Sequence, residues 1–299
     1  MRNSLLAVLC LAIFLSGCGS DTLREKSATQ LLTEANAEKN PASRTTKLCS
    51  AARKLHDAKD VIGLRQALSA AVASSQQVED PQMRAGVQIK TAAALAKFGQ
   101  QQEASDMLTR AREAARKVAD PVIKVQILSD AAWALGDVEG SAGTITAYCQ
   151  EALLIADGIT EPAAQVQSYA AIVRPASKAS SPDLADEVLA KARAAAELAE
   201  TPARASLAQA QIGAALVKIE RADDATQAFQ LARTKADAIE DADTRAYALV
   251  KLGEILITAK RKPEAEQVLA AAEASAQNIK SASDQAAVME VVNKVRGRL

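Results

Sequence analysis

The chain has 299 residues, of which 36 are basic and 36 acidic, so its formal net charge at pH 7 is zero. Hydrophobic residues make up 49% of the chain and aromatic residues only 2%, which favours packed helices over a β-rich or nucleotide-stacking protein. We expect no nucleic-acid partner, because the one basic triplet, Lys260-Arg261-Lys262, is interpreted as a solvated turn and no other patch could neutralise phosphates.

Residues 1–17 are predicted to be a signal peptide. Arg2 precedes an apolar run from Leu5 to Leu15, which is too short to span a bilayer. The sequence Leu15-Ser16-Gly17-Cys18 follows and resembles the lipobox of bacterial lipoproteins. The resemblance implies cleavage before Cys18, lipid attachment to Cys18 and, because Gly19 is not Asp, a periplasm-facing position at the outer membrane. The alternative is an ordinary signal peptide in which Cys18 stands by chance.

Residues 18–40 are predicted to hold the lipidated cysteine and an N-terminal capping helix. The stretch from Asp21 to Lys39 has the pattern of one helix, with Ala28, Leu31 and Ala35 on its apolar face. The charged residues Arg24 and Glu38 occupy the other stripe positions, as expected of a helix that closes the end of a repeat array.

A unit of about 40 residues repeats along residues 41–281. Each copy opens at a proline or at an alanine in its place, and the openings are 40 or 41 residues apart. A fixed period of this size is typical of stacked helical units, not of a compact enzyme core. The opening residues are Pro41, Pro81, Pro121, Pro162, Pro202 and Ala242, and Ala282 follows at the same spacing.

Each opening residue is expected to begin a helix. A residue that can accept a hydrogen bond from the first helical amides precedes it, and a proline directly after such a cap fits the first helical position. The preceding residues are Asn40, Asp80, Asp120, Glu161, Thr201, Asp241 and Ser281, among which Glu161 is the weaker choice. We therefore predict six helical hairpins in residues 41–281 and a closing helix in residues 282–299.

The copy that opens at Pro202 illustrates one hairpin. Its first helix is expected to run to about Ile219, and Asp223 to cap the second helix. The second helix carries one apolar stripe with steps of 4, 3, 4 and 3 residues, interpreted as core: Ala225, Phe229, Ala232, Ala236 and Ile239. In the copy that opens at Pro162, we expect Pro175 to stop the first helix about a turn early.

Two copies resemble the tetratricopeptide repeat. The residues that carry the resemblance are Ile212-Gly213, Leu216, Ala225, Phe229 and Ala232, and Leu249, Leu252-Gly253, Leu256, Ala265, Leu269 and Ala272. The unit here is 40 residues long, whereas that family has 34, so we expect longer helices and a different superhelical pitch. The resemblance implies an all-α, right-handed α-solenoid of 14 helices, whose first helices line a concave surface.

The sequence contains no recognisable catalytic or metal-binding constellation, so we expect neither an enzyme nor a cofactor. The only histidine is His56, which has no ligand partner at metal-binding spacing and is interpreted as a surface residue. One histidine does not support a Ser–His–Asp set, and no phosphate-cradling glycine motif is present. Cys49 and Cys149 are interpreted as packed thiols, because they belong to different repeats.

A candidate binding site is predicted on the first helices of the third and fourth copies. If the family geometry holds, the surface positions lie 5, 8, 12 and 16 residues after the opening residue. In the third copy these are Gln126, Ser129, Trp133 and Asp137, and in the fourth they include Gln167, Ala170, Arg174 and Lys178. Trp133 is the only tryptophan, in a column otherwise made of charged and small residues. We predict a partner-binding site at Gln126, Trp133, Gln167 and Arg174, since Trp and Arg are typical hot-spot residues. The alternative is that Trp133 only fills space.

Three functions are compatible with these features. The first is a non-catalytic, membrane-anchored scaffold of the bacterial envelope that binds a protein or peptide on its concave face, as tetratricopeptide-like proteins do. The second is a structural or spacer lipoprotein without a specific client. The third is an enzyme or small-ligand receptor whose site the sequence does not reveal.

Overall fold

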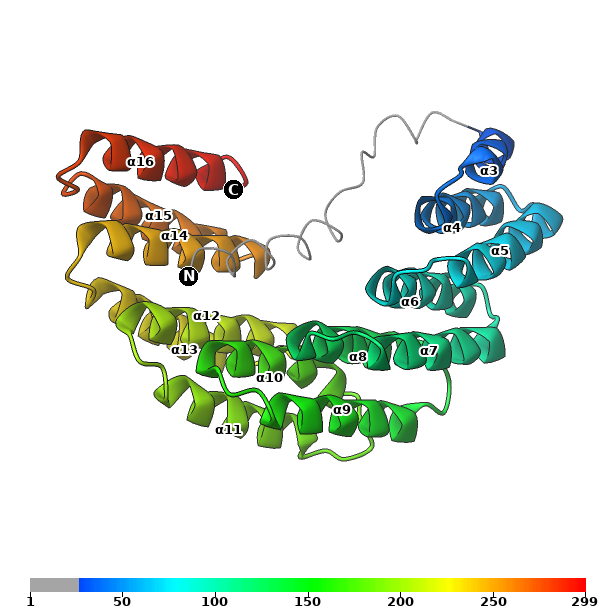
Figure 1. Cartoon of the computed structure of the whole chain (residues 1–299), viewed down its shortest axis with the longest axis horizontal. Coiled ribbons are helices and arrows are strands. Elements are labelled where there is room, and N and C mark those ends of the chain that lie inside the picture. The colour runs from blue at the N-terminus through cyan, green and yellow to red at the C-terminus, as the bar shows by residue number, and fades with distance from the viewer. Residues whose placement is uncertain (1–26) are drawn as a thin grey trace. The chain divides into compact units, whose positions relative to one another are not determined.

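The computed structural model describes residues 27–299, which are 79% helical and contain 14 helices and no strand. The chain forms two compact units, Met1–Glu79 and Asp80–Leu299, which are described separately below. Within the described residues, the first unit contains α3 to α5 and the second α6 to α16 (Figure 1). The predicted all-α array of helical hairpins is confirmed.

The helices follow the repeat along the whole described chain. The terminal helix is α3 (Ala28–Ala37). The hairpins are α4 (Pro41–Asp57) with α5 (Val61–Gln76), α6 (Pro81–Lys97) with α7 (Gln101–Arg116), α8 (Pro121–Leu135) with α9 (Ala142–Asp157), α10 (Pro162–Ala176) with α11 (Leu184–Glu197), α12 (Pro202–Lys218) with α13 (Ala222–Asp237), and α14 (Ala242–Thr258) with α15 (Lys262–Ala276). The last helix is α16 (Ala282–Arg296).

Side-chain caps fix the start of every first helix. All seven opening residues are the first residues of helices, and each residue before them accepts a hydrogen bond from a backbone amide two or three residues ahead. The Asn40 amide oxygen accepts from the Ser43 amide at 3.0 Å. Even Glu161 caps its helix, accepting from the Ala164 amide at 2.6 Å. Each such cap stabilises its helix by about 1 kcal/mol.

Several second helices begin without a side-chain cap. A tight turn with a residue at positive φ precedes three of them, α7, α13 and α15: Gly99, Glu220 and Lys260. Lys59 forms the same turn before α5, which does have a side-chain cap, because Asp60 accepts from the Gly63 amide. The expectation that Asp223 caps α13 is therefore wrong, because α13 begins at Ala222 and Asp223 lies in its first turn. The turn instead closes through the backbone, where the Arg221 amide donates to the Leu216 carbonyl at 3.0 Å.

Packing within Asp80–Leu299 produces two rows of helices. Each first helix packs against its own second helix and against the first helix of the next hairpin. We call α6, α8, α10, α12, α14 and α16 the A row, and α7, α9, α11, α13 and α15 the B row. The predicted stripe of α13 is buried along its whole length. Gly213 lies so close to Phe229 that an added Cβ would be 2.8 Å from the ring, which explains the glycine in that column.

Two element boundaries differ from the expectation. The terminal helix α3 begins at Ala28, not at Asp21, because Ser27 is extended and forms a capping box with Gln30. The signal peptide, Cys18 and residues up to 26 lie outside the described part of the chain. Helix α10 has 15 residues where α12 has 17, so it ends two residues early and not a full turn early, with Pro175 accommodated in its last turn.

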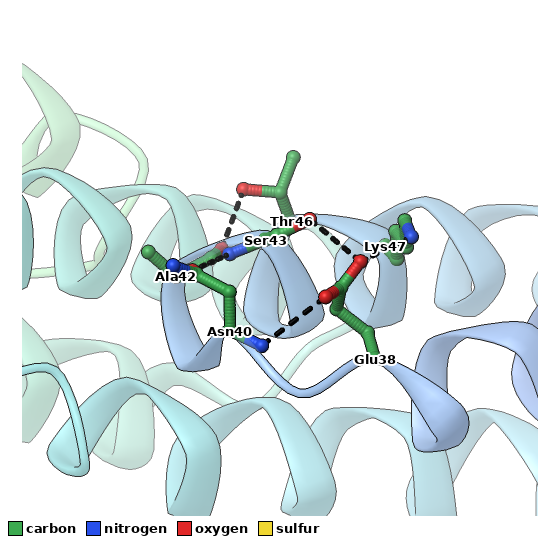
Figure 2. A network of polar contacts seen from close by, with 6 residues as sticks. All are labelled: Glu38, Asn40, Ala42, Ser43, Thr46 and Lys47. Atoms are coloured by element: carbon green, nitrogen blue, oxygen red, sulfur yellow. Dashed lines mark hydrogen bonds and ion pairs between the residues drawn. The ribbon is translucent and has the colours of Figure 1, made fainter.

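The junction of α3 and α4 is held by a polar network around Glu38 (Figure 2). The Glu38 carboxylate accepts hydrogen bonds from the Asn40 amide at 3.1 Å, the Ser43 hydroxyl at 3.2 Å and the Lys47 ammonium at 2.5 Å. These donors, led by Lys47, lower the pKa of Glu38 to about 2. The three-residue connection thus turns the chain back, so that α3 and α4 pack side by side in opposite directions.

Candidate functional site

An unusual group of side chains lies on the A row where α8, α10 and α12 pack next to one another. Trp133, in the last turn of α8, is partly exposed. Arg174 and Lys178 contact this indole, Asp130 and Lys218 interact electrostatically with Arg174, and Gln126 donates a hydrogen bond to Asp130. We call these six residues the Trp133 cluster: Gln126, Asp130, Trp133, Arg174, Lys178 and Lys218.

Helix α8 contributes three members of the cluster. Gln126, Asp130 and Trp133 are spaced by four and three residues, so they lie on one helical face. The Gln126 side-chain amide donates to the Asp130 carboxylate at 3.0 Å. The surface position expected at Ser129 is wrong, since Ser129 is only 2% exposed and, among the described residues, its hydroxyl has no hydrogen-bond partner. The exposed face of α8 therefore runs through Asp130 instead.

Two cations from the α10 end of the next hairpin lie over the indole. The Arg174 guanidinium carbon is 3.5 Å from the centroid of the Trp133 ring, and the Lys178 ammonium nitrogen is 3.6 Å from it. A cation over an aromatic face is attracted by the ring quadrupole, by about 0.5–2 kcal/mol depending on exposure. Trp133 thus links two successive hairpins of the A row through cation–π contacts.

Gly136 creates the space in which Lys178 lies. A Cβ added at Gly136 would be 2.6 Å from the Lys178 ammonium and 2.7 Å from its Cδ atom. The lysine therefore crosses the C-terminal end of α8, whose helix dipole favours positive charge. A glycine at the end of one helix and a lysine just after the next first helix together determine this contact.

The charges of the cluster are shifted by the protein atoms around them. Desolvation raises the pKa of Asp130, and the hydrogen bond from Gln126 and the charges of Lys218 and Arg174 oppose it. Desolvation lowers the pKa of Arg174, and it lowers the pKa of Lys218 together with the charge of Arg174. Asp130 and Lys218 keep solvent-exposed surface, so crowding by neighbouring helices and not complete burial causes these shifts.

The positive charge of the cluster is incompletely balanced. Among the described residues, Arg174, Lys178 and Lys218 form no ion pair, and Asp130 is the only carboxylate that contributes to the shifts of Arg174 and Lys218. Arg174 and Lys218 therefore share one carboxylate on a partly exposed surface, and Lys178 adds a third cation over the indole. This arrangement can bind a group from outside the chain that is negatively charged, accepts hydrogen bonds or packs against the indole.

The structure brings together most of the residues expected at this site. Gln126, Trp133 and Arg174 belong to the cluster, whereas no hydrogen bond or ion pair within residues 27–299 joins Gln167 to it. Asp130 and Lys218 were not expected. Asp130 could have been recognised because it lies four residues after Gln126 and three before Trp133, but the place of Lys218 depends on how α12 packs beside α10.

The histidine and the two cysteines of the described residues lie outside the Trp133 cluster. His56 is exposed, with its Nδ1 atom 3.6 Å from the Asp57 carboxylate. Cys49 and Cys149 are not in a disulfide, Cys49 is half-buried, and burial raises the pKa of Cys149 to about 12. Residues 27–299 contain no group of three or more His, Cys, Asp or Glu side chains that could hold a metal ion. Nor is any helix in this range both long and apolar enough to cross a membrane.

Comparisons with known proteins add little to this description. No family model matches the chain, and no curated protein matches it. Among solved structures, the chain is similar to the crystal structure of Ton1535 from Thermococcus onnurineus NA1, with 15% sequence identity and a TM-score of 0.44. The alignment covers 89% of this chain and 95% of that one. A likeness this distant carries no argument about function, which therefore depends on the residues described above.

Proposed function

We propose that this protein is a non-catalytic, membrane-anchored scaffold of the bacterial envelope that binds a protein or peptide on its A-row face. The observation that carries the proposal is the Trp133 cluster, a half-buried indole under two cations that have no ion-pair partner among the described residues. The resemblance of two repeat copies to tetratricopeptide repeats, a family of partner-binding helical hairpins, supports the same function.

The cluster suits an extended partner segment with an acidic character. The exposed edge of Trp133 supplies contact area, and the Gln126 amide could hydrogen-bond a partner backbone. A carboxylate brought by the partner would relieve the excess positive charge at Arg174, Lys178 and Lys218. Large aromatic and arginine side chains are the types that dominate binding energy in protein interfaces.

Trp133→Ala is the test of this surface. A partner that copurifies at fixed stoichiometry from detergent-solubilised membranes should bind the variant with an affinity lower by about 2 kcal/mol or more, which is about 30-fold. Titration calorimetry or surface plasmon resonance measures this change. Tyr247→Ala is a matched control, because Tyr247 is an aromatic on the A-row helix α14 that is 40% exposed and lies outside the cluster.

Three outcomes would contradict the proposal. An affinity within about threefold of the original, in a variant with unchanged circular dichroism, would exclude the cluster as a hot spot. Equal losses for Trp133→Ala and Tyr247→Ala would place the binding elsewhere on the A row. Association with bulk cell wall and with no stoichiometric protein would favour a spacer function.

The location of the protein at the membrane is proposed from Cys18. Lipid on this residue would hold the chain at the membrane. Replacing Cys18 with Ser and fractionating the cells tests this anchor. We expect the variant to move from the membrane fraction to the soluble fraction, because stable anchoring needs more than one inserted acyl chain and the lipidated cysteine would carry them. An unchanged membrane fraction would place the anchor elsewhere in the chain.

A further inference from the structure

The turn between α4 and α5, in the first unit, exposes two neighbouring branched apolar side chains. Val61 and Ile62, the first two residues of α5, are 65% and 74% exposed. They lie beside a shallow depression lined by His56, Lys59, Asp60, Val61 and Leu64. Single exposed apolar residues are common on soluble proteins, but two large ones side by side at the tip of a turn leave water in contact with a continuous apolar surface.

Stacking of the repeats does not require these residues. The first two residues of the other second helices include no exposed branched aliphatic side chain: Gln101 and Gln102 in α7, Ala142 and Gly143 in α9, Leu184 and Ala185 in α11, Ala222 and Asp223 in α13, and Lys262 and Pro263 in α15. The α4–α5 turn therefore departs from the repeat in one property, the apolar character of its exposed tip.

The chain enters the first unit at the same end as this tip. Helix α3 runs antiparallel to α4, with the turn between them held by Glu38 (Figure 2), so the start of α3 lies toward the α4–α5 end of the hairpin. Helix α4 has 17 residues and α3 has 10, so at about 1.5 Å per residue α4 extends about 10 Å beyond the start of α3. The tip is thus the part of the hairpin that reaches farthest past the entry point.

The distance from a lipid on Cys18 to this end is short. Eight residues lie between Cys18 and Ser27, which makes nine steps along the chain, and a fully extended chain spans at most about 3.3–3.6 Å per step, so Ser27 is within about 32 Å of the anchored residue. A membrane that holds Cys18 is therefore within reach of the tip without any unfolding of the described residues.

The charges next to the tip also suit a membrane surface. Lys59 and Arg65 are exposed beside Val61 and Ile62, whereas the exposed Asp57 carboxylate lies at the end of α4, 3.6 Å from the Nδ1 atom of His56. The Asp60 carboxylate is directed to the backbone, where it accepts from the Gly63 amide at 2.9 Å. Exposed lysine and arginine next to apolar side chains are the combination that binds anionic headgroups while the apolar groups enter the boundary below them.

We propose that residues 59–65 lie in the headgroup region of the same membrane that holds the lipid on Cys18. The proposal rests on the lipid anchor of the proposed function and adds a second, protein-made contact. The lipid supplies the affinity, and the tip fixes the orientation of the first unit on the bilayer. Val61 and Ile62 enter the interface, with Lys59 and Arg65 at the phosphates.

The test uses full-length lipidated protein reconstituted into vesicles of phosphatidylethanolamine and phosphatidylglycerol with brominated acyl chains. Ile62→Trp places a reporter at the tip, and Gln102→Trp places one at the equivalent, exposed second residue of α7. The unsubstituted protein gives the background from Trp133. We expect brominated lipid to quench the added fluorescence of Ile62→Trp about twofold or more, because an interfacial indole lies next to the acyl chains, and to leave Gln102→Trp unchanged.

The outcomes separate failure of the tip from failure of the anchor. If both variants float with the vesicles but are quenched equally, the tip contact is wrong and the anchor stands. If neither floats, the anchor and the tip contact both fail. If the emission of Ile62→Trp shifts to shorter wavelength with protein concentration in detergent and brominated lipid does not quench it, the tip is a contact between copies and the membrane proposal fails.

Discussion

Two aromatic clusters within Asp80–Leu299 use the same residue types in opposite ways. In the B row, Tyr148 of α9 is 1% exposed, and the guanidinium carbon of Arg112 from α7 is 4.7 Å from its ring centroid. The Glu151 carboxylate binds both Arg112 and Arg116. In the A row, Trp133 is partly exposed under Arg174 and Lys178, which form no ion pair among the described residues.

The difference indicates how a structural cluster can be told from a binding surface. Burial by itself would raise the pKa of Glu151, but hydrogen bonds from Arg116 and Arg112 outweigh it, and the pKa is lowered. The Glu151 carboxylate and both arginines therefore find their ion-pair partners inside the protein. In the A row the environment disfavours the charges of Asp130, Arg174 and Lys218 alike, so their interactions are not completed within the described chain.

The largest expected effect comes from removing the two aromatic rings in turn. Tyr148→Ala should lower the free energy of unfolding by about 3–5 kcal/mol, because a fully buried ring leaves a cavity. Trp133→Ala should lower it by about 1–2 kcal/mol, because the indole is partly exposed and lies under flexible side chains. Urea denaturation followed by circular dichroism measures both. If Trp133→Ala costs as much as Tyr148→Ala, then Trp133 is a core residue and the comparison fails.

Neutralising the carboxylate of each cluster should have a smaller effect, with opposite signs. Glu151→Gln leaves the half-buried Arg112 and the exposed Arg116 without their partner and should lower the free energy of unfolding at pH 7 by about 1 kcal/mol, because solvent screens part of the interaction. Asp130→Asn should leave stability unchanged or raise it, because the protein disfavours the ionised form of Asp130. A clear loss of stability in Asp130→Asn would show that the A-row charges are balanced after all.

The pH dependence follows from the directions of the two pKa shifts. The lowered pKa of Glu151 means that its stabilisation is complete above the ordinary glutamate pKa and is lost as the pH falls through the folded value. The raised pKa of Asp130 means that its protonated form stabilises the fold at low pH, and this contribution is lost as the pH rises. Both differences from the unsubstituted protein should therefore shrink in acid, which denaturation curves at pH 7 and pH 4 can check.

The sequence predicts the helix starts better than the cluster because the two depend on different distances. A cap such as Asp120 and its target amides lie within three residues, so the cap can be recognised from neighbouring residues in the sequence. The starts of the second helices were harder, since Glu220 and Lys260 adopt positive φ without being the Gly or Asn usual there. On α8 the sequence predicted Ser129 at the surface, whereas the structure has Asp130 there, one residue later. The packing of the next first helix against α8 determines which of its residues are buried.

Lys178 shows which part of the cluster could not be predicted, because its place on the surface of the fourth copy was expected but its contact was not. Its contact with Trp133 depends on the space above Gly136, which lies in another hairpin 42 positions earlier in the chain. No local pattern connects a glycine at the end of α8 with a lysine after α10. Only the packing of α8 against α10 brings the two together.

This dependence leads to the smallest expected effect, that of Gly136→Ala. Gly136 has ordinary helical angles, so alanine is compatible with its backbone and should gain about 0.4–1 kcal/mol by restricting the unfolded chain. The new methyl group would displace the Lys178 ammonium and forfeit a cation–π contact of about 0.5–1 kcal/mol. The two terms nearly cancel, so the free energy of unfolding should change by less than about 0.5 kcal/mol.

The readout is then the fluorescence of Trp133, because it is the only tryptophan in the chain. Gly136→Ala should shift the emission maximum as Lys178→Ala does, and adding Gly136→Ala to Lys178→Ala should produce no further shift, since both remove the same contact. Gly143→Ala is the matched control, because nothing lies within 4 Å of the Cβ that it adds. Additive shifts in the double variant, or an equal shift in Gly143→Ala, would mean that Gly136 does not position Lys178 over the indole.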